Sequence, residues 1–213
     1  MKGRIQKIIP LSKKFHNVFR FTRRIAEVEL AGGVRYSFVR HVLETGPAVS
    51  ILPYFYDKES KDWHVILVRQ YRPAVSAISL EAPGGLLNQG KSVKAEMARE
   101  LHEEAGTRVS TRDIKVVDTH HLASSFCDQV VHLGIVCLPV ESNKEFLRKL
   151  KRYHGVVSEQ EFTQVISLPI QKLLTKSNLV KYTLTKYQIH DLARRLGYFS
   201  KKENKFYTDI KTA

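Results

Sequence analysis

The sequence predicts an α+β fold, because most of the chain has the pattern of short β-strands and only two or three segments have that of helices. Alternating or continuous apolar runs, typical of strands, lie both before and after one strongly helical segment, residues 93–105. Helical spacing recurs at residues 181–196, and Pro169 can begin a short helix that runs to Leu174. At 213 residues, 43% hydrophobic and 26% charged, the composition is that of an ordinary globular domain.

The N-terminal part is basic and then predicts a hairpin. Residues 1–26 contain eight Lys or Arg and no Asp or Glu. A nucleic-acid arm, a transit peptide and an exposed basic edge segment all fit this charge, and the lack of a clean amphipathic helix favours the edge segment. Residues 25–30 and 34–39 alternate on either side of the turn at 31–33, which predicts a β-hairpin.

Two longer strands are expected after the break at Gly46-Pro47. Residues 48–54 have the composition of a buried strand, and residues 63–71 that of its returning partner. The polar segment 57–62 between them predicts the tip of a hairpin.

The segment after the main helix is expected to return to a sheet. Residues 113–120 and 130–140 have strand patterns separated by a polar loop. Residues 141–155 are basic and poorly patterned, and residues 156–168 are expected to end in a further strand.

The helix at residues 93–105 is sharply bounded. Ser92 is a suitable N-cap, and Gly106 suits the left-handed residue that ends a helix. One arc of the helix is apolar and faces the expected core. The arc beside it is acidic and consists of Glu96, Glu100, Glu103 and Glu104.

This acidic arc has two interpretations. Like charges three or four residues apart on a helix cost roughly 0.2–0.5 kcal/mol per pair, which a solvated acidic face tolerates. A bound divalent cation would instead replace the repulsion by coordination, and clustered carboxylate oxygens suit Mg²⁺ or Mn²⁺ better than Zn²⁺.

The spacing around the arc favours the cation. The segment from Gly85 to Thr107 resembles the Nudix box of the Nudix hydrolase family, G-x5-E-x7-R-E-U-x-E-E-x-G-U with U apolar. The matching residues are Gly85, Arg99, Glu100, Leu101, Glu103, Glu104 and Gly106. The chain departs from the pattern at Lys91, which replaces the first glutamate, and at Thr107, which replaces the last apolar residue.

The resemblance implies the Nudix fold, a mixed β-sheet sandwiched between α-helices, here with an N-terminal β-hairpin extension. It implies a division into residues 1–45, a basic segment and hairpin that can contribute to a dimer, residues 46–200, the hydrolase domain, and residues 201–213, a charged tail.

The resemblance also implies a metal-dependent enzyme. Glu100, Glu103 and Glu104, with the carbonyl oxygen of Gly84, are the expected ligands of one to three Mg²⁺ or Mn²⁺ ions. The expected general base is Glu159 or Glu161, which precede the last strand, or else one of the box glutamates Glu103 and Glu104.

Lys91 alters the expected pairing within the box. In the family, the first glutamate commonly pairs with the box arginine, here Arg99, and Lys91 cannot do so. We therefore expect Arg99 to turn toward Glu103 or Glu96. A catalytically weakened module that only binds a nucleotide stays an alternative for the same reason.

Two flanking segments are similar to the ADP-ribose pyrophosphatase branch of the family. They read VRQYRP at residues 68–73 and LEAPGG at residues 80–85. This similarity implies hydrolysis of the pyrophosphate bond of ADP-ribose or a related ADP-sugar to AMP and a sugar phosphate. Arg69, Arg72 and Glu81 are the expected substrate-binding residues, although Arg72 and Glu81 can also form a simple ion pair.

The loop at residues 122–129 departs from that branch, because it lacks the usual Pro-Gly turn and glutamate. The group linked to the nucleoside diphosphate is therefore left open. The net charge of +14 also keeps an RNA 5′-end substrate as an alternative, although no RNA-binding motif is present.

The remaining expectations concern assembly and location. The resemblance implies a homodimer formed through the N-terminal hairpin. No run of 18 apolar residues occurs, so no membrane span is expected. Two cysteines without a metal-binding spacing suit a reducing compartment, and a cytoplasmic location is expected.

Overall fold

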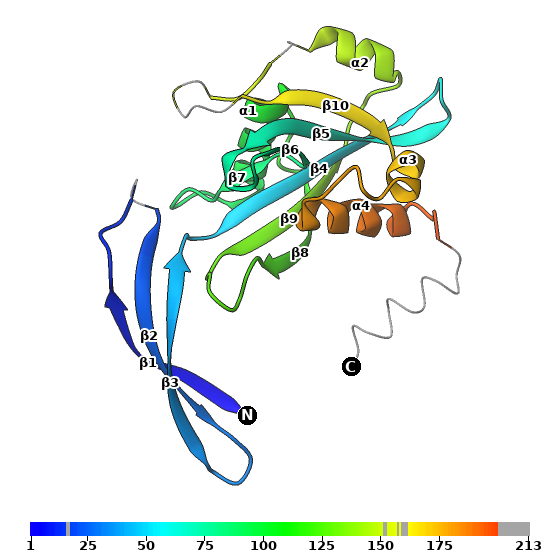
Figure 1. Cartoon of the computed structure of the whole chain (residues 1–213). Helices are drawn as coiled ribbons and strands as arrows, with labels where there is room; N and C mark the ends of the chain where they lie inside the picture. The colour runs from blue at the N-terminus through cyan, green and yellow to red at the C-terminus, as the bar shows by residue number, and fades with distance from the viewer. Residues whose placement is uncertain (16–17, 151–152, 157, 159–161, 200–213) are drawn as a thin grey trace.

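The chain folds into two β-sheets and four α-helices in the part that the structure, a computed structural model, describes. The described residues are 1–15, 18–150, 153–156, 158 and 162–199. A small three-stranded sheet stands beside a larger body that contains the second sheet and the helices (Figure 1).

The small sheet is antiparallel, in the order β1-β2-β3. Its strands are β1 (Lys2–Pro10), β2 (Arg20–Glu29) and β3 (Arg35–Glu44). The predicted hairpin is confirmed as β2 and β3, both longer than expected. The basic segment before it forms the edge strand β1, whose exposed lysines and arginines are typical of an edge protected from further pairing.

The large sheet is mixed, as expected for the fold. Its central order is β10-β5-β4-β9-β8, in which β4 and β9 are parallel and the other neighbours are antiparallel. The strands are β4 (Ala48–Asp57), β5 (Asp62–Arg72), β6 (Ala77–Glu81), β7 (Gly84–Leu86), β8 (Lys115–His121), β9 (Val130–Cys137) and β10 (Gln164–Pro169).

The segment between β5 and the main helix lies in a gap within this sheet. We call residues 77–86 the wedge segment. β4 and β5 pair with each other only near their shared hairpin, at Tyr54–Asp57 and Asp62–Val65. Farther from the hairpin the two strands diverge, so β5 pairs with β6 and β4 pairs with β7. Residues 77–86 therefore lie where the sheet opens.

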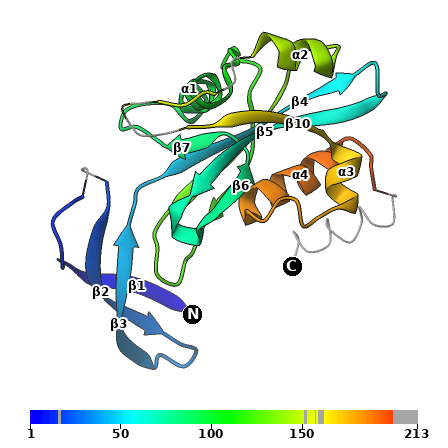
Figure 2. The same ribbon diagram turned by 45° about the horizontal axis from the view of Figure 1, so that its top comes forward.

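Helices cover both faces of the large sheet (Figure 2). The helices are α1 (Val93–Ala105), α2 (Asn143–Lys149), α3 (Ile170–Thr175) and α4 (Thr183–Arg195). Ile51 and Phe55 of β4 pack in the same core as α1, whereas Leu52 packs with α3 and α4. Since successive side chains of a strand point to opposite faces, two-sided coverage explains the continuous apolar run of β4.

The helices confirm most of the sequence expectations. The α1 helix has the predicted bounds: Ser92 accepts a hydrogen bond from the Ala95 amide, and Gly106 ends the helix with φ of 63°. The helices α3 and α4 also lie where they were expected. The short helix α2 was not predicted, because only Phe146 among its residues packs against the core and a single contact leaves no periodic pattern.

A buried glutamine joins α4 to the centre of the sheet. Gln188 is 1% exposed, and its Oε1 accepts a hydrogen bond of 2.9 Å from Ser50 Oγ. Its Nε2 donates to the carbonyl oxygens of Ser50 and Gly134, both at 3.3 Å. Every polar atom of this side chain is therefore paired in the interior, as burial requires. Among the described residues, no helix has the length and apolar character needed to cross a membrane.

We expect Gln188→Met to destabilise the fold by about 1–3 kcal/mol, because it leaves Ser50 Oγ and two carbonyl groups buried without this partner. Urea unfolding followed by circular dichroism measures the change. The control is Gln171→Met on the exposed side of α3, which should change stability by less than about 0.5 kcal/mol. Equal stability of the two variants would show that Gln188 does not hold α4 on the sheet.

Candidate active site

Two glycines let the wedge segment approach its neighbours closely, β4 at Gly84 and α1 at Gly85. A Cβ atom at Gly84 would overlap the carbonyl oxygen of Val49, and one at Gly85 would overlap the carboxylate of Glu100. The amide of Gly84 donates a hydrogen bond of 2.9 Å to Glu104 Oε2, and the carbonyl of Pro83 accepts one of 2.8 Å from Ile51. Glycine is needed at both positions because the backbone of β7 lies directly against β4 at Gly84 and against the acidic arc of α1 at Gly85.

The acidic arc is buried. Glu96, Glu100 and Glu104 are only 1%, 5% and 3% exposed, while the side chain of Glu103 keeps 30% of its exposure. This overturns the interpretation of the arc as a solvated acidic face. Removing carboxylates from water is unfavourable unless they are paired, so the arc needs positive charge or hydrogen-bond donors beside it.

Arg99 supplies that charge. Its Nε lies 2.6 Å from Glu96 Oε1, and its two Nη atoms contact Glu100 and Glu103. Burial opposes the charge of the guanidinium, but the surrounding glutamates outweigh it and raise the pKa of Arg99. The expectation that Arg99 turns toward Glu103 or Glu96 is confirmed, and the contact with Glu100 adds to it.

The fit of a divalent ion depends on these carboxylates. In the described part of the chain, no three His, Cys, Asp or Glu side chains converge as a metal site. The arc is closed around a guanidinium instead, which shows that it accommodates positive charge. Its carboxylates and the nearby Gly84 carbonyl are oxygen donors of the kind that Mg²⁺ and Mn²⁺ prefer, so the residues fit such an ion by their chemistry.

Arg72 and Glu81 form a second charged group beside the arc. Arg72 Nε and Nη2 donate to the two oxygens of Glu81 at 3.0 and 2.7 Å. These bonds raise the pKa of Arg72, to which Glu104 also contributes through its charge. The pair expected from the sequence is therefore formed across β5 and β6, close enough to α1 for Glu104 to act on it.

Arg69 does not join this pair. It is exposed, and because it lies three residues before Arg72 on a strand, its side chain leaves the opposite face. The structure thus brings together Arg72, Glu81 and the acidic arc but leaves Arg69 apart.

Gln70 is a residue of this region that the sequence reasoning did not select. It lies on the same face of β5 as Arg72, and it is 9% exposed. Its Oε1 atom is buried and has no hydrogen-bond partner among the described residues. The sequence did contain a signal for Gln70. It is a polar residue on the core-facing side of a strand, and a buried polar side chain needs a hydrogen-bond partner.

Glu159 and Glu161, the predicted general-base candidates, lie outside the described residues. The ends of their loop are described. His154 and Thr163 form a pair of backbone hydrogen bonds, both at 2.9 Å. The Gly155 amide donates to the carbonyl of Glu103, and Thr163 Oγ1 donates to that of Glu104. The base of the loop is thereby attached to the last turn of α1.

The loop at residues 122–129 has a structural contact. Asp128 accepts hydrogen bonds from Arg24 at 2.7 Å and from the Thr45 amide at 3.0 Å. It therefore ties the small sheet to the body.

Comparison with known proteins identifies the family. The NUDIX domain family matches residues 44–186. The chain belongs to the Nudix family. Hydrolases of this family generally use divalent metal ions.

The similar proteins are enzymes by name. The ADP-sugar pyrophosphatase of Mus musculus is 31% identical over 133 residues, which are 62% of this chain and 57% of that protein. The ADP-ribose pyrophosphatase of Bacillus subtilis (strain 168) is 24% identical over 150 residues, 70% of this chain and 71% of that protein. The chain thus spans little more than half of the mouse relative.

A solved structure supports the fold. The crystal structure of an ADP compounds hydrolase matches with a TM-score of 0.62 and covers 93% of this chain and 98% of its own. Its sequence is 21% identical, so the match shows that the Nudix fold is shared.

Proposed function

We propose that the chain hydrolyses the pyrophosphate bond of a nucleoside diphosphate derivative, ADP-ribose or a related ADP-sugar, to AMP and a sugar phosphate. The observation that carries this proposal is the buried acidic arc packed against Gly84 and Gly85, with Arg72 and Glu81 beside it. The similarity to proteins named ADP-sugar and ADP-ribose pyrophosphatases supports the choice of substrate.

Glu100, Glu103 and Glu104, with the carbonyl oxygen of Gly84, hold Mg²⁺ or Mn²⁺ in this proposal. When bound there, the ion would supply positive charge for the diphosphate and would make a water molecule more acidic. The hydrogen bond from the Gly84 amide keeps the carboxylate of Glu104 in place for this role.

The residues of β5 and β6 bind the substrate. Glu81 is buried and holds the guanidinium of Arg72 through two hydrogen bonds, which orients its remaining donors for a phosphate. The unpaired acceptor of Gln70 suits a hydroxyl group of a sugar. Arg69 contributes positive charge from the exposed face of the strand.

The proton of the attacking water goes to a carboxylate. Glu159 and Glu161 are the candidates in the loop whose ends are bonded to the last turn of α1, and that attachment supports this role. The box glutamates Glu103 and Glu104 are the alternative bases.

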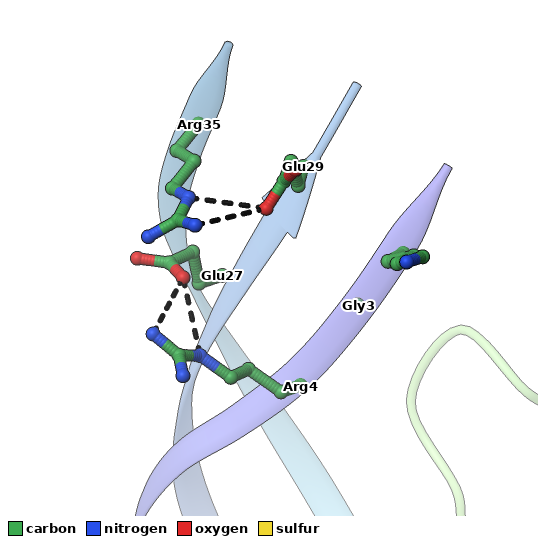
Figure 3. A pocket seen from close by; sticks show the side chains of 6 residues that line it. Gly3, Arg4, Glu27, Glu29 and Arg35 are labelled. Carbon is green, nitrogen blue, oxygen red and sulfur yellow. Dashed lines mark hydrogen bonds and ion pairs between the residues drawn. The ribbon is translucent and has the colours of Figure 1, made fainter. Parts of the chain in front are cut away.

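In this proposal, residues 1–45 form an extension and residues 46–200 form the hydrolase domain. Two copies of the chain form a homodimer through the small sheet of the extension. Ile5, Ala26 and Phe38 are cross-strand neighbours and share one face of the small sheet with Tyr36. Ile5, Tyr36 and Phe38 are 51%, 55% and 38% exposed, a cluster of apolar surface that a second copy can cover. The opposite face carries the pairs Arg4–Glu27 and Arg35–Glu29 (Figure 3).

The free thiols of Cys127 and Cys137 support a reducing compartment such as the cytoplasm.

Activity should require Mg²⁺ or Mn²⁺ and be lost with a chelator. We expect Glu104→Gln to lower kcat by on the order of 100-fold or more, because the neutral amide is a weaker ligand, while the fold survives. The release of AMP measures kcat, and circular dichroism shows whether the variant is folded. Glu141→Gln, at an exposed ion pair with Lys58, is the control and should keep wild-type kcat. Wild-type turnover by the Glu104 variant would show that α1 does not hold the metal.

A substrate panel tests the choice between a small molecule and RNA. We expect ADP-ribose or a close ADP-sugar to be cleaved with a modest salt effect, because Arg72 and Glu81 form one compact group beside the arc. Affinity for an RNA substrate would fall with salt at a log–log slope of about −0.7 per phosphate contacted. We would incubate the protein with ADP-sugars, dinucleotides and capped RNA. Mass spectrometry of the products then shows which substrate is cleaved. Efficient cleavage of capped RNA with ADP-ribose left intact would contradict the proposal.

The dimer is tested by adding charge to the apolar face of the small sheet. Phe38→Glu should convert the dimer to a monomer, since a carboxylate cannot be buried there without a partner. Sedimentation velocity measures the change. Leu179→Glu lies away from the small sheet at a similar exposure of 37% and should stay dimeric. A wild-type protein that sediments as a monomer at micromolar concentration would rule out this interface.

A further inference from the structure

The first turn of α4 lies against the end of β6. Thr185 is fully buried, and its Oγ1 accepts a hydrogen bond of 2.8 Å from the amide of Ala82. Ala82 directly follows Glu81, whose carboxylate holds the guanidinium of Arg72. Since Tyr182 precedes Thr185 by three residues, this bond brings the N-terminal end of α4 to the Arg72–Glu81 pair.

Tyr182 is the N-cap residue of α4, but its side chain does not cap the helix. Its carbonyl oxygen accepts a hydrogen bond of 3.0 Å from the Lys186 amide, which fixes its backbone. The side chain is half-buried and packs against a cluster formed by Ala48, Val131, Leu133 and Leu184. The ring is therefore held in place, whereas the hydroxyl has no hydrogen-bond partner among the described residues.

The charges of the neighbouring pair act on this hydroxyl. Burial raises the pKa of the Tyr182 phenol, the negative charge of Glu81 raises it further, and the positive charge of Arg72 lowers it. The pKa of Arg72 is raised mainly by its hydrogen bonds to Glu81, and the charges of Glu104 and Tyr182 add to this effect. Arg72 is therefore within electrostatic reach of α1 through Glu104 and of the start of α4 through Tyr182.

The hydrogen-bonding groups left over at this place are donors. A guanidinium has five N–H groups, and Glu81 accepts two of those of Arg72, so three remain. The O–H group of Tyr182 lies beside them and stays protonated near neutral pH, because its pKa lies above the ordinary value of 10.0. Neighbouring donors that include a positive charge suit a ligand with several acceptor oxygens and negative charge, and a phosphate group has both.

We propose that Tyr182 is a substrate-contacting residue whose hydroxyl donates a hydrogen bond to the same phosphate group that Arg72 binds. The inference rests on the proposed function, which assigns Arg72 to the diphosphate of the substrate. The acidic arc of α1 then lies on one side of the diphosphate, and Arg72 and Tyr182 lie on the other. Because its ring is already packed, the tyrosine loses little conformational freedom when the substrate arrives.

Tyr182→Phe tests the contact, because it removes the hydroxyl and keeps the packed ring. We expect KM for ADP-ribose to rise about tenfold and kcat to change by less than about twofold, since a hydrogen bond made equally in the ground and transition states contributes to binding alone. Steady-state release of AMP in the presence of Mg²⁺ measures both constants. The melting temperature should change by less than about 2 °C, because the hydroxyl has no partner within the described protein.

Tyr56→Phe is the matched control, because it removes the same atom elsewhere on the sheet. Tyr56 is 42% exposed and pairs with Trp63 at the hairpin end of β4, whereas β7 pairs with the other end of that strand. The KM and kcat of this variant should therefore equal those of the wild type. An equal rise of KM in both variants would overturn the contact in favour of a general effect of losing a hydroxyl.

A series of ADP-sugars distinguishes the phosphate from the terminal sugar. If the hydroxyl contacts a phosphate, Tyr182→Phe raises KM by the same factor for ADP-ribose, ADP-glucose and ADP-mannose. A factor that varies with the sugar would overturn the assignment to the phosphate. A double-mutant cycle with Arg72→Gln gives a second readout: residues that share one phosphate should show non-additive effects on kcat/KM, and additive effects would contradict the sharing.

The outcomes separate this inference from the proposed function. If the wild type cleaves ADP-ribose and Tyr182→Phe has wild-type KM and kcat, the contact is overturned and the proposed function stands. If the higher KM comes with a melting temperature lowered by far more than 2 °C, a structural role replaces the contact. If the wild type neither cleaves any ADP-sugar nor binds one in isothermal titration calorimetry, both the proposed function and the contact are overturned.

Discussion

The structure of the site depends on the burial of charged side chains between α1 and the backbone of β7. Three glutamates of one helix are almost fully removed from water, and the glycines of the wedge segment provide the space. Such burial is tolerated only with compensating charge and hydrogen bonds, which here come from Arg99, Asn88 and the Gly84 amide. In the described part of the chain, the guanidinium of Arg99 is the cation that balances these carboxylates.

The divergence of β4 and β5 determines where these charges meet. Because the strands pair only near their hairpin, the sheet opens and admits β6 and β7 into the gap. Glu81 at the end of β6 then reaches Arg72, and Gly84 at the start of β7 reaches Glu104. The helices on both faces keep the strands in this position, and Gln188 fixes one of them to the central strands. The fold thus places Arg72 and Glu81 beside the carboxylate cluster of α1.

The small sheet is connected to the larger body by polar contacts with the loop at residues 122–129. Asp128 joins Arg24 and Thr45, and β3 continues toward β4 through the break at Gly46-Pro47. Its exposed apolar face and its charged face differ sharply in chemistry, although both arise from simple alternation along the strands. The loop at residues 122–129 is thus the part of the body that contacts the small sheet.

The sequence alone determined the α+β class, the bounds of α1 and the box residues, because caps, helical spacing and the box motif are local signals. It also limited the partners of Arg99 to the acidic residues of its own helix. Tertiary structure decided the rest. It buried Glu96, Glu100 and Glu104 and left Gln70 Oε1 without a partner among the described residues, because burial and pairing depend on segments distant in sequence that meet only in the fold. The strand β1 and the helix α2 escaped prediction for the same physical reason: each is stabilised by contacts with a neighbour rather than by its own pattern.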